Sequence, residues 1–280
     1  MGVDLNWFQN LIYGMISGLT EILPVSAQAH RLVLRKIFGT HYVPGITLLL
    51  IHVGIFAAVF MTCQNHLLRI SRARHLAKIP KKRRKRPLDV VSLMDHHLLM
   101  TMLIPVIIAF ILSYPITKHE DNILLVSLLL ILNGIILYAP QFLPGSNKDA
   151  RTLSRMQGLY IGIGAAFSAL PGISAIGMAT SVGQAVGEDR KYSFRMALLL
   201  EGFILIFLIL RDFLQIASTG LGGIHFSLIM QSLLSGAGAF GTTLLGIRLM
   251  RRMAEGNGFA DLGLYCWVIA VISLLLSLLV

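Results

Sequence analysis

The sequence has 280 residues, of which 55% are hydrophobic and only 13% are charged, and its formal net charge is +11. Soluble domains carry about 25% charged residues, so this composition excludes an ordinary soluble globular domain. The charges also lie in short stretches between long apolar runs, which is typical of a polytopic helical membrane protein.

The first apolar region, residues 6–38, is interrupted at its centre by Thr20, Glu21 and Pro24. A proline removes an amide donor and clashes with the preceding helical turn. We therefore predict two half-helices that meet at a break and form a re-entrant hairpin. Such breaks are tolerated at membrane depth only where protein or a wet cavity surrounds them.

Polar side chains cluster at this break, where Glu21 is followed by Ser26 and His30. A carboxylate in hydrocarbon costs several kcal/mol unless it is partnered or hydrated. One interpretation is that Glu21 and Thr20 only cap the half-helix that begins near Pro24. The other is a polar pocket for an anionic ligand, with or without a cation.

Three uninterrupted apolar stretches follow, at about 44–63, 97–116 and 122–143, each long enough to span roughly 30 Å of hydrocarbon. The segment 64–96 between the first two contains ten Lys and Arg residues from Arg69 to Arg86. In a soluble protein this run would indicate nucleic-acid binding. Between two spans it predicts a cytoplasmic loop, beside which anionic lipid headgroups lie. We expect the membrane, and no nucleic acid, as a partner.

The second broken region, residues 154–187, is interrupted at Leu170-Pro171-Gly172. A glycine-rich break that opens a helix exposes backbone N–H groups at the positive end of the helix dipole, which suits phosphate. Small residues also serve close helix packing in membranes, so the pattern alone leaves both interpretations open.

The last three spans are expected at about 193–213, 224–246 and 262–280. The loop charges place 64–96, 144–156 and 247–259 inside, and 39–43, 117–121 and 217–223 outside. These assignments agree only if the two hairpins enter from opposite sides. We therefore predict a single all-α integral membrane domain, 1–280, with about six transmembrane helices and two re-entrant hairpins. It would consist of inverted repeats at about 1–143 and 150–280.

Two ionisable residues lie within expected membrane spans, which is unusual. His52 and Glu201 occupy similar places after the two hairpins, each one or two residues before a glycine. An ionisable residue inside the membrane is a functional hypothesis by default. Either the two form a pair that takes part in ion coupling, or they are unrelated residues near the interfaces.

The run Gly-Leu-Thr-Glu-Ile-Leu-Pro-Val-Ser from Gly18 to Ser26, followed by His30, resembles the signature of the undecaprenyl-diphosphate phosphatase family of the bacitracin-resistance type. Leu170-Pro171-Gly172-x-Ser174 is similar to the first half of that family's second motif. The resemblance covers nearly the whole chain. It implies inverted repeats with re-entrant hairpins in the bacterial cytoplasmic membrane. The implied reaction converts undecaprenyl diphosphate to undecaprenyl phosphate for cell-envelope lipid-carrier recycling, often with a divalent cation, Mg²⁺ or Ca²⁺.

The resemblance also implies roles for individual residues. Those expected in catalysis are Glu21, Ser26, His30 and Ser174, with Glu21 also the metal ligand. Those expected to bind the substrate phosphates are Thr20, Gly172, Ser174 and Thr180; Arg31, which stands where the family is usually apolar, is added to them as a compensating candidate.

Several family residues are replaced. Ser17 stands where the family has a second acid, and Ala175 where it has an arginine; Ala27 and Ile176 replace serines. Arginine is the side chain suited to forked recognition of phosphate oxygens. Arg31 and Arg195 either compensate in the pocket or extend to the membrane interfaces.

Two functions therefore remain open: a phosphatase whose activity is weakened, and a non-catalytic polyprenyl-phosphate binder or flippase-like transporter. The sequence is compatible with both functions. It specifies no lipid chain length, transport direction or oligomeric state.

Overall fold

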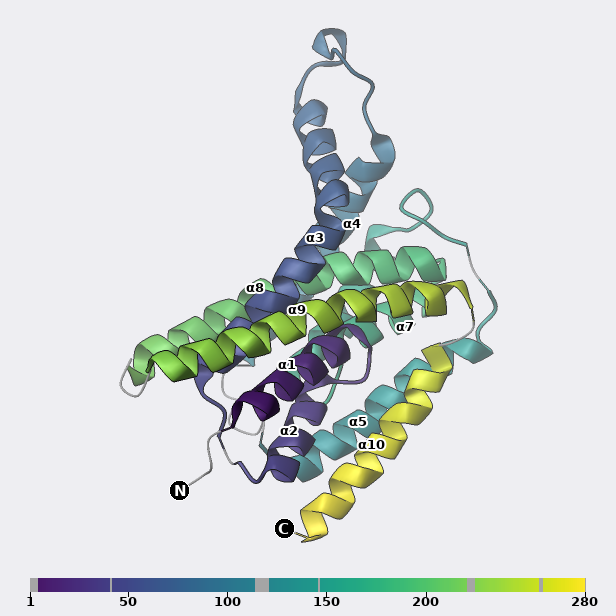
Figure 1. Cartoon of the computed structure of the whole chain (residues 1–280). Coiled ribbons are helices and arrows are strands. Elements are labelled where there is room, and N and C mark those ends of the chain that lie inside the picture. Colours follow the sequence, from purple (N-terminus) through teal and green to yellow (C-terminus); the bar gives the residue numbers. More distant parts are fainter. Residues whose placement is uncertain are drawn as a thin grey trace.

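The computed structural model describes residues 5–40, 42–113, 121–145, 147–220, 225–256 and 259–279. Over these ranges the protein is helical and has no β-strand; an isolated bridge pairs Lys148 with Glu188. The helices are α1 (Trp7–Ile22), α2 (Ala27–Phe38), α3 (Gly45–Lys78), α4 (Val90–Leu112), α5 (Ile123–Tyr138), α6 (Arg155–Ala166), α7 (Ala175–Ala185), α8 (Arg190–Thr219), α9 (Phe226–Glu255) and α10 (Phe259–Leu279) (Figure 1). Short 3₁₀ turns lie at Lys81–Arg83, Ala139–Phe142 and Phe167–Ala169.

Six of these helices are long and apolar enough to cross a membrane, which confirms the prediction of about six spans. They are α3, α4, α5 with its extension to Phe142, α8, α9 and α10. The helices α1, α2, α6 and α7 have 16, 12, 12 and 11 residues. At about 1.5 Å per residue, each is too short to cross alone. They form two pairs, α1–α2 and α6–α7, with breaks at the predicted prolines.

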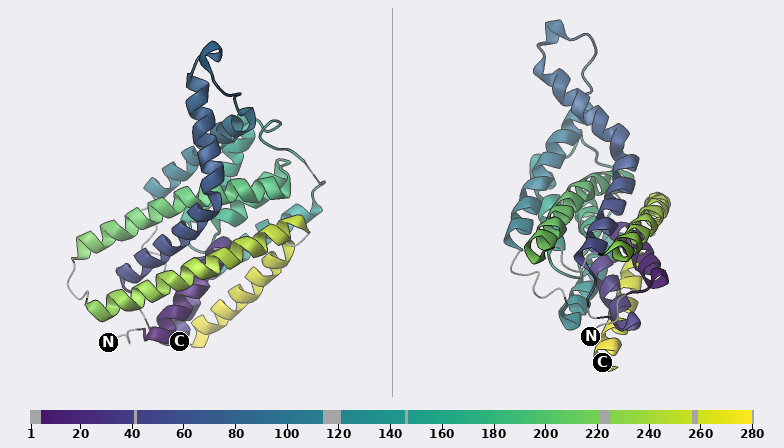
Figure 2. Two further views of the ribbon diagram at one scale, coloured as in Figure 1. Left: turned by 45° about the horizontal axis from the view of Figure 1, so that its top comes forward. Right: turned by 60° about the vertical axis from the view of Figure 1, so that its left-hand side comes forward.

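The basic segment 64–96 is mostly helical, although the sequence predicts a loop there. Helix α3 continues to Lys78 and α4 begins at Val90, with one 3₁₀ turn between them. Apolar content marks only the part of a helix that lies in hydrocarbon, whereas Arg and Lys are good helix formers. The two helices form a protrusion that stands away from the bundle in every view (Figures 1 and 2). Helices α8 and α9 likewise extend past their expected ends, to Thr219 and Glu255.

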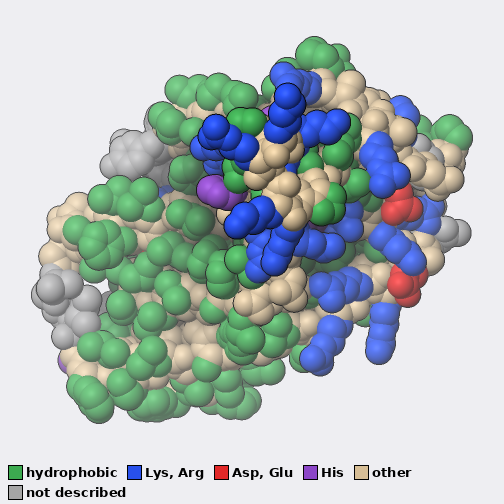
Figure 3. All heavy atoms as spheres, turned by 90° about the horizontal axis from the view of Figure 1, so that it is seen from above, with side chains coloured by type: hydrophobic (Ala, Val, Ile, Leu, Met, Phe, Trp, Pro, Cys, Tyr) green, Lys and Arg blue, Asp and Glu red, His purple; other side chains and the backbone are tan. Residues whose placement is uncertain are grey.

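Lys and Arg side chains gather on the face that carries the protrusion, as Figure 3 shows. A single basic face is what we expect if the segments 64–96 and 247–259 lie on the same side of the membrane. Most of the predicted outer segment 117–121, including Lys118 and Glu120, and residues 221–224 lie outside the described ranges.

The bundle is held by helix pairs from the two halves of the chain. Helix α1 packs on α9, α6 on α4, α3 on α8, and α5 on α10. Contact between α1 and α9 is backbone to backbone, because a Cβ at Gly14 or Gly18 would lie 2.0 or 2.2 Å from the carbonyl oxygens of Ser235 and Ala239. Small residues allow this close approach where no hydrophobic effect drives helices together. The two breaks lie close together, since Asn133 of α5 hydrogen-bonds to both.

Candidate functional site

The first break is a tight turn over residues 23–26. Ser26 has φ 63° and ψ 98° and is the single non-glycine residue with positive φ among those described. Its Oγ accepts a hydrogen bond from the Ala29 amide at 3.3 Å and so caps α2. Backbone strain of this kind persists only where the surroundings hold it, and it is common at functional sites.

The second break follows the same plan. Gly172 has φ +101°, and a Cβ there would lie 2.6 Å from the Val126 carbonyl oxygen, so the turn requires glycine. Ser174 then caps α7 by accepting from the Gly177 amide at 3.2 Å. Two helices, α2 and α7, therefore begin at capping serines.

Asn133 of α5 joins the two breaks. Its Nδ2 donates to the Pro24 carbonyl at 2.9 Å, and its Oδ1 accepts from the Ser174 amide at 3.0 Å. A Cβ at Gly177 would lie 3.0 Å from Pro24 Cβ. The start of α7 is thus packed against the first break. Because the N-terminus of a helix attracts anions, an anion where the breaks meet would face backbone N–H groups.

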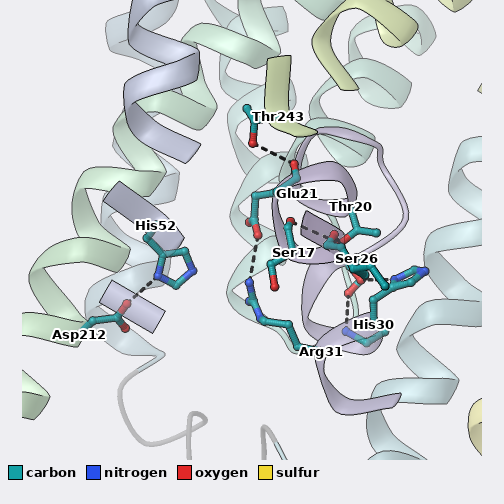
Figure 4. Close-up of polar contacts among 12 residues, drawn as sticks. Ser17, Thr20, Glu21, Ser26, His30, Arg31, His52, Asp212 and Thr243 are labelled. Carbon is teal, nitrogen blue, oxygen red and sulfur yellow. Dashed lines mark hydrogen bonds and ion pairs between the residues drawn. The ribbon is translucent and has the colours of Figure 1, made fainter. Parts of the chain in front are cut away.

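Arg31 faces the retained carboxylate. Its Nη1 lies 3.3 Å from Glu21 Oε2, and the two side chains are 14% and 15% exposed. Figure 4 shows the pair reaching across the first break. Of the two alternatives for Arg31, the structure shows the one in which the guanidinium reaches the polar site. Ser17, one turn before Glu21, is fully buried, and its Oγ has no hydrogen-bond partner among the described residues.

His30 is held on another side. Its Nδ1 lies 2.8 Å from the Ser26 carbonyl oxygen and its Nε2 lies 2.9 Å from the Tyr265 hydroxyl, against which the ring stacks. A carbonyl only accepts, so Nδ1 carries the proton and Nε2 accepts from Tyr265. In Figure 4 His30 points away from Glu21. The structure brings Glu21 to Arg31 and His30 to Tyr265, a residue that sequence reasoning missed.

The predicted phosphate-binding hydroxyls divide into two groups. Thr20 and Thr180 donate to carbonyls one turn earlier, at Ile16 and Ile176, both at 2.7 Å. These hydroxyl protons are therefore already used. The capping hydroxyls of Ser26 and Ser174 accept hydrogen bonds, and an accepting hydroxyl keeps its own proton for a ligand.

His52 pairs with Asp212, so the predicted pairing with Glu201 is wrong. The distance from His52 Nδ1 to Asp212 Oδ2 is 2.6 Å, and both side chains are buried. Helices α3 and α8 run in opposite directions (Figure 1). His52 lies seven residues after the first residue of α3, Gly45, and Asp212 seven residues before the last residue of α8, Thr219. Glu201 is buried elsewhere on α8, within electrostatic range of Glu21.

Arg195 lies outside this site. It is exposed at the start of α8, and its guanidinium carbon lies 5.0 Å from the centre of the Tyr192 ring. This position fits the alternative in which the side chain extends to the membrane interface.

The described residues contain no group of three or more His, Cys, Asp and Glu side chains that could hold a metal ion. Magnesium is commonly bound by one or two carboxylates together with substrate phosphates. Glu21 fits such a shared arrangement, but Arg31 already neutralises this carboxylate. A cation and Arg31 would therefore compete for Glu21.

A family model described as bacitracin resistance protein BacA matches residues 10–272. The chain belongs to the BacA family. Three BacA-like relatives carry the name undecaprenyl-diphosphatase. The protein of a Nocardioides species is 29% identical over 70% of each chain. That of Pelotomaculum thermopropionicum is 27% identical over 71% of this chain and 72% of its own. That of Methanobrevibacter smithii is 24% identical over 94% of this chain and 95% of its own.

The BacA match includes both breaks, the Glu21–Arg31 pair, the first five spans and most of the sixth. The chain is accordingly a multi-pass membrane protein of the BacA family.

Proposed function

We propose that this BacA family member binds a polyprenyl diphosphate, such as undecaprenyl diphosphate, where the two breaks meet, and hydrolyses it slowly. The observation that carries the proposal is the Glu21–Arg31 pair. It puts a guanidinium beside the retained family carboxylate although the family arginine is replaced by Ala175. The names of the relatives support the same substrate class.

In this proposal the diphosphate oxygens replace Glu21 as the partner of Arg31. The hydroxyls of Ser26 and Ser174 and the first N–H groups of α7 donate to the same oxygens. Glu21, released from Arg31, then orients the attacking water. Water attacks the terminal phosphorus and the P–O–P bond breaks. The products are inorganic phosphate and the polyprenyl monophosphate. Mg²⁺ or Ca²⁺, if bound at Glu21, would add neutralisation of the phosphate charge.

The rate is expected to be low for a specific reason. Phosphoryl transfer depends on positioning and charge neutralisation. The family's second acid is replaced by Ser17 and its arginine by Ala175. Arg31 is then the remaining charged group that can neutralise the phosphates, and it is already bound to Glu21. Loss of a single donor of this kind typically lowers kcat by roughly 10²–10³. His30 can act as a base only after Tyr265 leaves its Nε2.

The second candidate is a non-catalytic polyprenyl-phosphate binder or transporter. It is favoured by Ser17, whose buried hydroxyl has no partner in the part of the chain that the structure describes and takes the place of the second acid with a group of little use in hydrolysis. We also propose that the chain is an inverted repeat with re-entrant hairpins in the bacterial cytoplasmic membrane, an architecture typical of transporters. The packing of α1 on α9 and of α6 on α4, equivalent positions in the two halves, supports the repeat.

Phosphate release from undecaprenyl diphosphate by purified protein, with and without Mg²⁺ or Ca²⁺, tests the proposal. We expect slow release by the wild type and a further loss of at least about tenfold in Arg31→Ala and Glu21→Gln. Arg35→Ala is the matched control, because Arg35 lies one turn further along α2 and pairs with Asp121 instead.

Lipid binding is measured on the same samples. Binding that weakens in Arg31→Ala, with no phosphate release by any variant, would establish the second candidate. Absence of both binding and release in folded wild-type protein would overturn both.

A further inference from the structure

A buried carboxyl group that the proposed reaction does not use lies at the turn from α7 to α8. Glu188 is 2% exposed, and neither of its carboxyl oxygens has a hydrogen-bond partner in the described part of the chain. Its Oε2 and the Ser193 Oγ lie over Gly183, where a Cβ would come within 2.1 and 2.4 Å of them. The Ser193 hydroxyl donates to the Thr180 carbonyl at 3.2 Å.

The backbone fixes Glu188 in this position from both sides. The Glu188 amide donates to the Gly183 carbonyl at 2.8 Å, and Lys148 bonds the backbone of Gly187 and Asp189 at 3.1 and 3.0 Å. The Lys148 ammonium donates to the Val186 carbonyl, and no ion pair joins Glu188 to a Lys or Arg among the described residues. A charged carboxylate here would be buried without compensation, which is costly.

The ionisable groups around Glu188 come from several elements. Asp189 is its neighbour in the turn, Lys148 lies on the connection from α5 to α6, and Tyr192 and Arg195 lie on the first turns of α8. The Tyr192 hydroxyl donates to Asp95 of α4 at 2.8 Å, and Asp95 lies 2.9 Å from His66 Nε2 of α3. Burial is the main cause that raises the pKa of Glu188 to about 7, and the neighbouring Asp189 carboxylate adds to the rise.

We propose that Glu188 is a proton-binding site, in which the neutral carboxyl packs over Gly183 and loss of the proton loosens the turn between α7 and α8. The opposite end of α7 begins at Ser174, so the proton would control the anchoring of a helix that reaches the candidate site. The proposal does not depend on phosphatase activity.

The direction of the effect follows from linkage. The folded-state pKa lies above the ordinary value of 4.5. The stabilisation is therefore complete below about pH 4.5 and is lost as the pH rises to about 7, above which stability is level.

Infrared difference spectroscopy during a pH titration tests the site directly. We expect the carbonyl band of a protonated carboxylic acid to disappear at about pH 6–8 in the wild type. The band should be missing in Glu188→Gln and unchanged in Glu255→Gln. Glu255 is a suitable control because it is 63% exposed and pairs with Lys191 on the protein surface.

Thermal unfolding in detergent is the second measurement. The melting temperature should fall between pH 5 and 7 in the wild type and Glu255→Gln, and clearly less in Glu188→Gln. Gly183→Ala, which displaces the carboxyl, should shift the band's midpoint toward lower pH. A wild-type band that survives in Glu188→Gln, or that titrates near the ordinary pKa of glutamate, would overturn the proposal. Neither measurement uses phosphate release, so its failure is distinct from failure of the proposed function.

Discussion

The buried Asn133 side chain makes one hydrogen bond to each break of the chain, besides a weaker one to the Cys266 sulfur. The asparagine is 1% exposed, so neither the Pro24 carbonyl nor the Ser174 amide would find water in its absence. Leaving a buried donor or acceptor unsatisfied costs about 1–3 kcal/mol each. The amide therefore determines whether α7 begins beside the first break.

We predict that Asn133→Ala lowers both the melting temperature and the affinity for undecaprenyl diphosphate. Asn10→Ala is the matched control. Asn10 is also buried and donates to the Leu5 carbonyl and to Gln231, but it lies on the contact between α1 and α9. The control should lose stability and keep its affinity. Equal loss of affinity in both variants would contradict the role given to Asn133.

At this scale the sequence predicted the residue types of the site better than their partners. Glu21 and Arg31 lie ten positions apart across a recognisable break, so their proximity follows from local chain geometry. The partners of His30 and His52 are Tyr265 and Asp212, which lie on distant helices. Helical periodicity states which face a residue occupies, but it does not state which helix packs against that face.

Among the helices, the contact of α1 with α9 combines close approach with hydroxyl donors. Thr242 and Thr243 of α9 donate to the carbonyls of Met15 and Gly18 at 2.7 and 3.0 Å (Figure 4 shows the second). These bonds form only because glycines let the two backbones approach. Interhelical hydrogen bonds and van der Waals contact are the main attractions between helices in a membrane.

Gly18→Ala should therefore destabilise the protein by about 1–3 kcal/mol, the usual cost of overpacking. Its new Cβ would meet the Ala239 backbone, which cannot give way as a side chain can. Gly241→Ala, on α9 with open space around it, should leave stability unchanged or raise it slightly. Scanning calorimetry in detergent compares the two variants. Matching melting temperatures would refute the backbone contact.

Helix number and breaks were predictable, whereas helix ends were not. Proline and glycine mark a break through their own backbone chemistry, so Pro24 and Pro171 were sufficient evidence. The end of a spanning helix depends on whether polar residues continue the helix into water. Hydropathy marks only the apolar part of the helix and does not indicate such an extension. For that reason the helical extension of α3 to Lys78 was missed.

For the whole molecule, the charge distribution predicts that the protrusion faces the cytoplasm. In intact cells, a membrane-impermeant thiol reagent should label Tyr42→Cys and leave Arg83→Cys unlabelled. Both positions are exposed, and the native Cys63 and Cys266 are buried. Labelling at both positions after permeabilisation is the control for reactivity. External labelling of Arg83→Cys in sealed cells would show that the orientation is the opposite of the predicted one.

Helix α3 is a single uninterrupted helix of 34 residues from Gly45 to the protrusion, about 50 Å long. When a rigid helix of this length tilts about a point near one end, its other end moves furthest. A tilt of about 10° at His52, where α3 contacts Asp212, would move the far end at Lys78, about 39 Å away, through about 7 Å, because the displacement grows with distance from the pivot. A pair of spectroscopic probes on the protrusion and on the end of α9 would magnify movements of the bundle that are too small to detect at the Glu21 site itself.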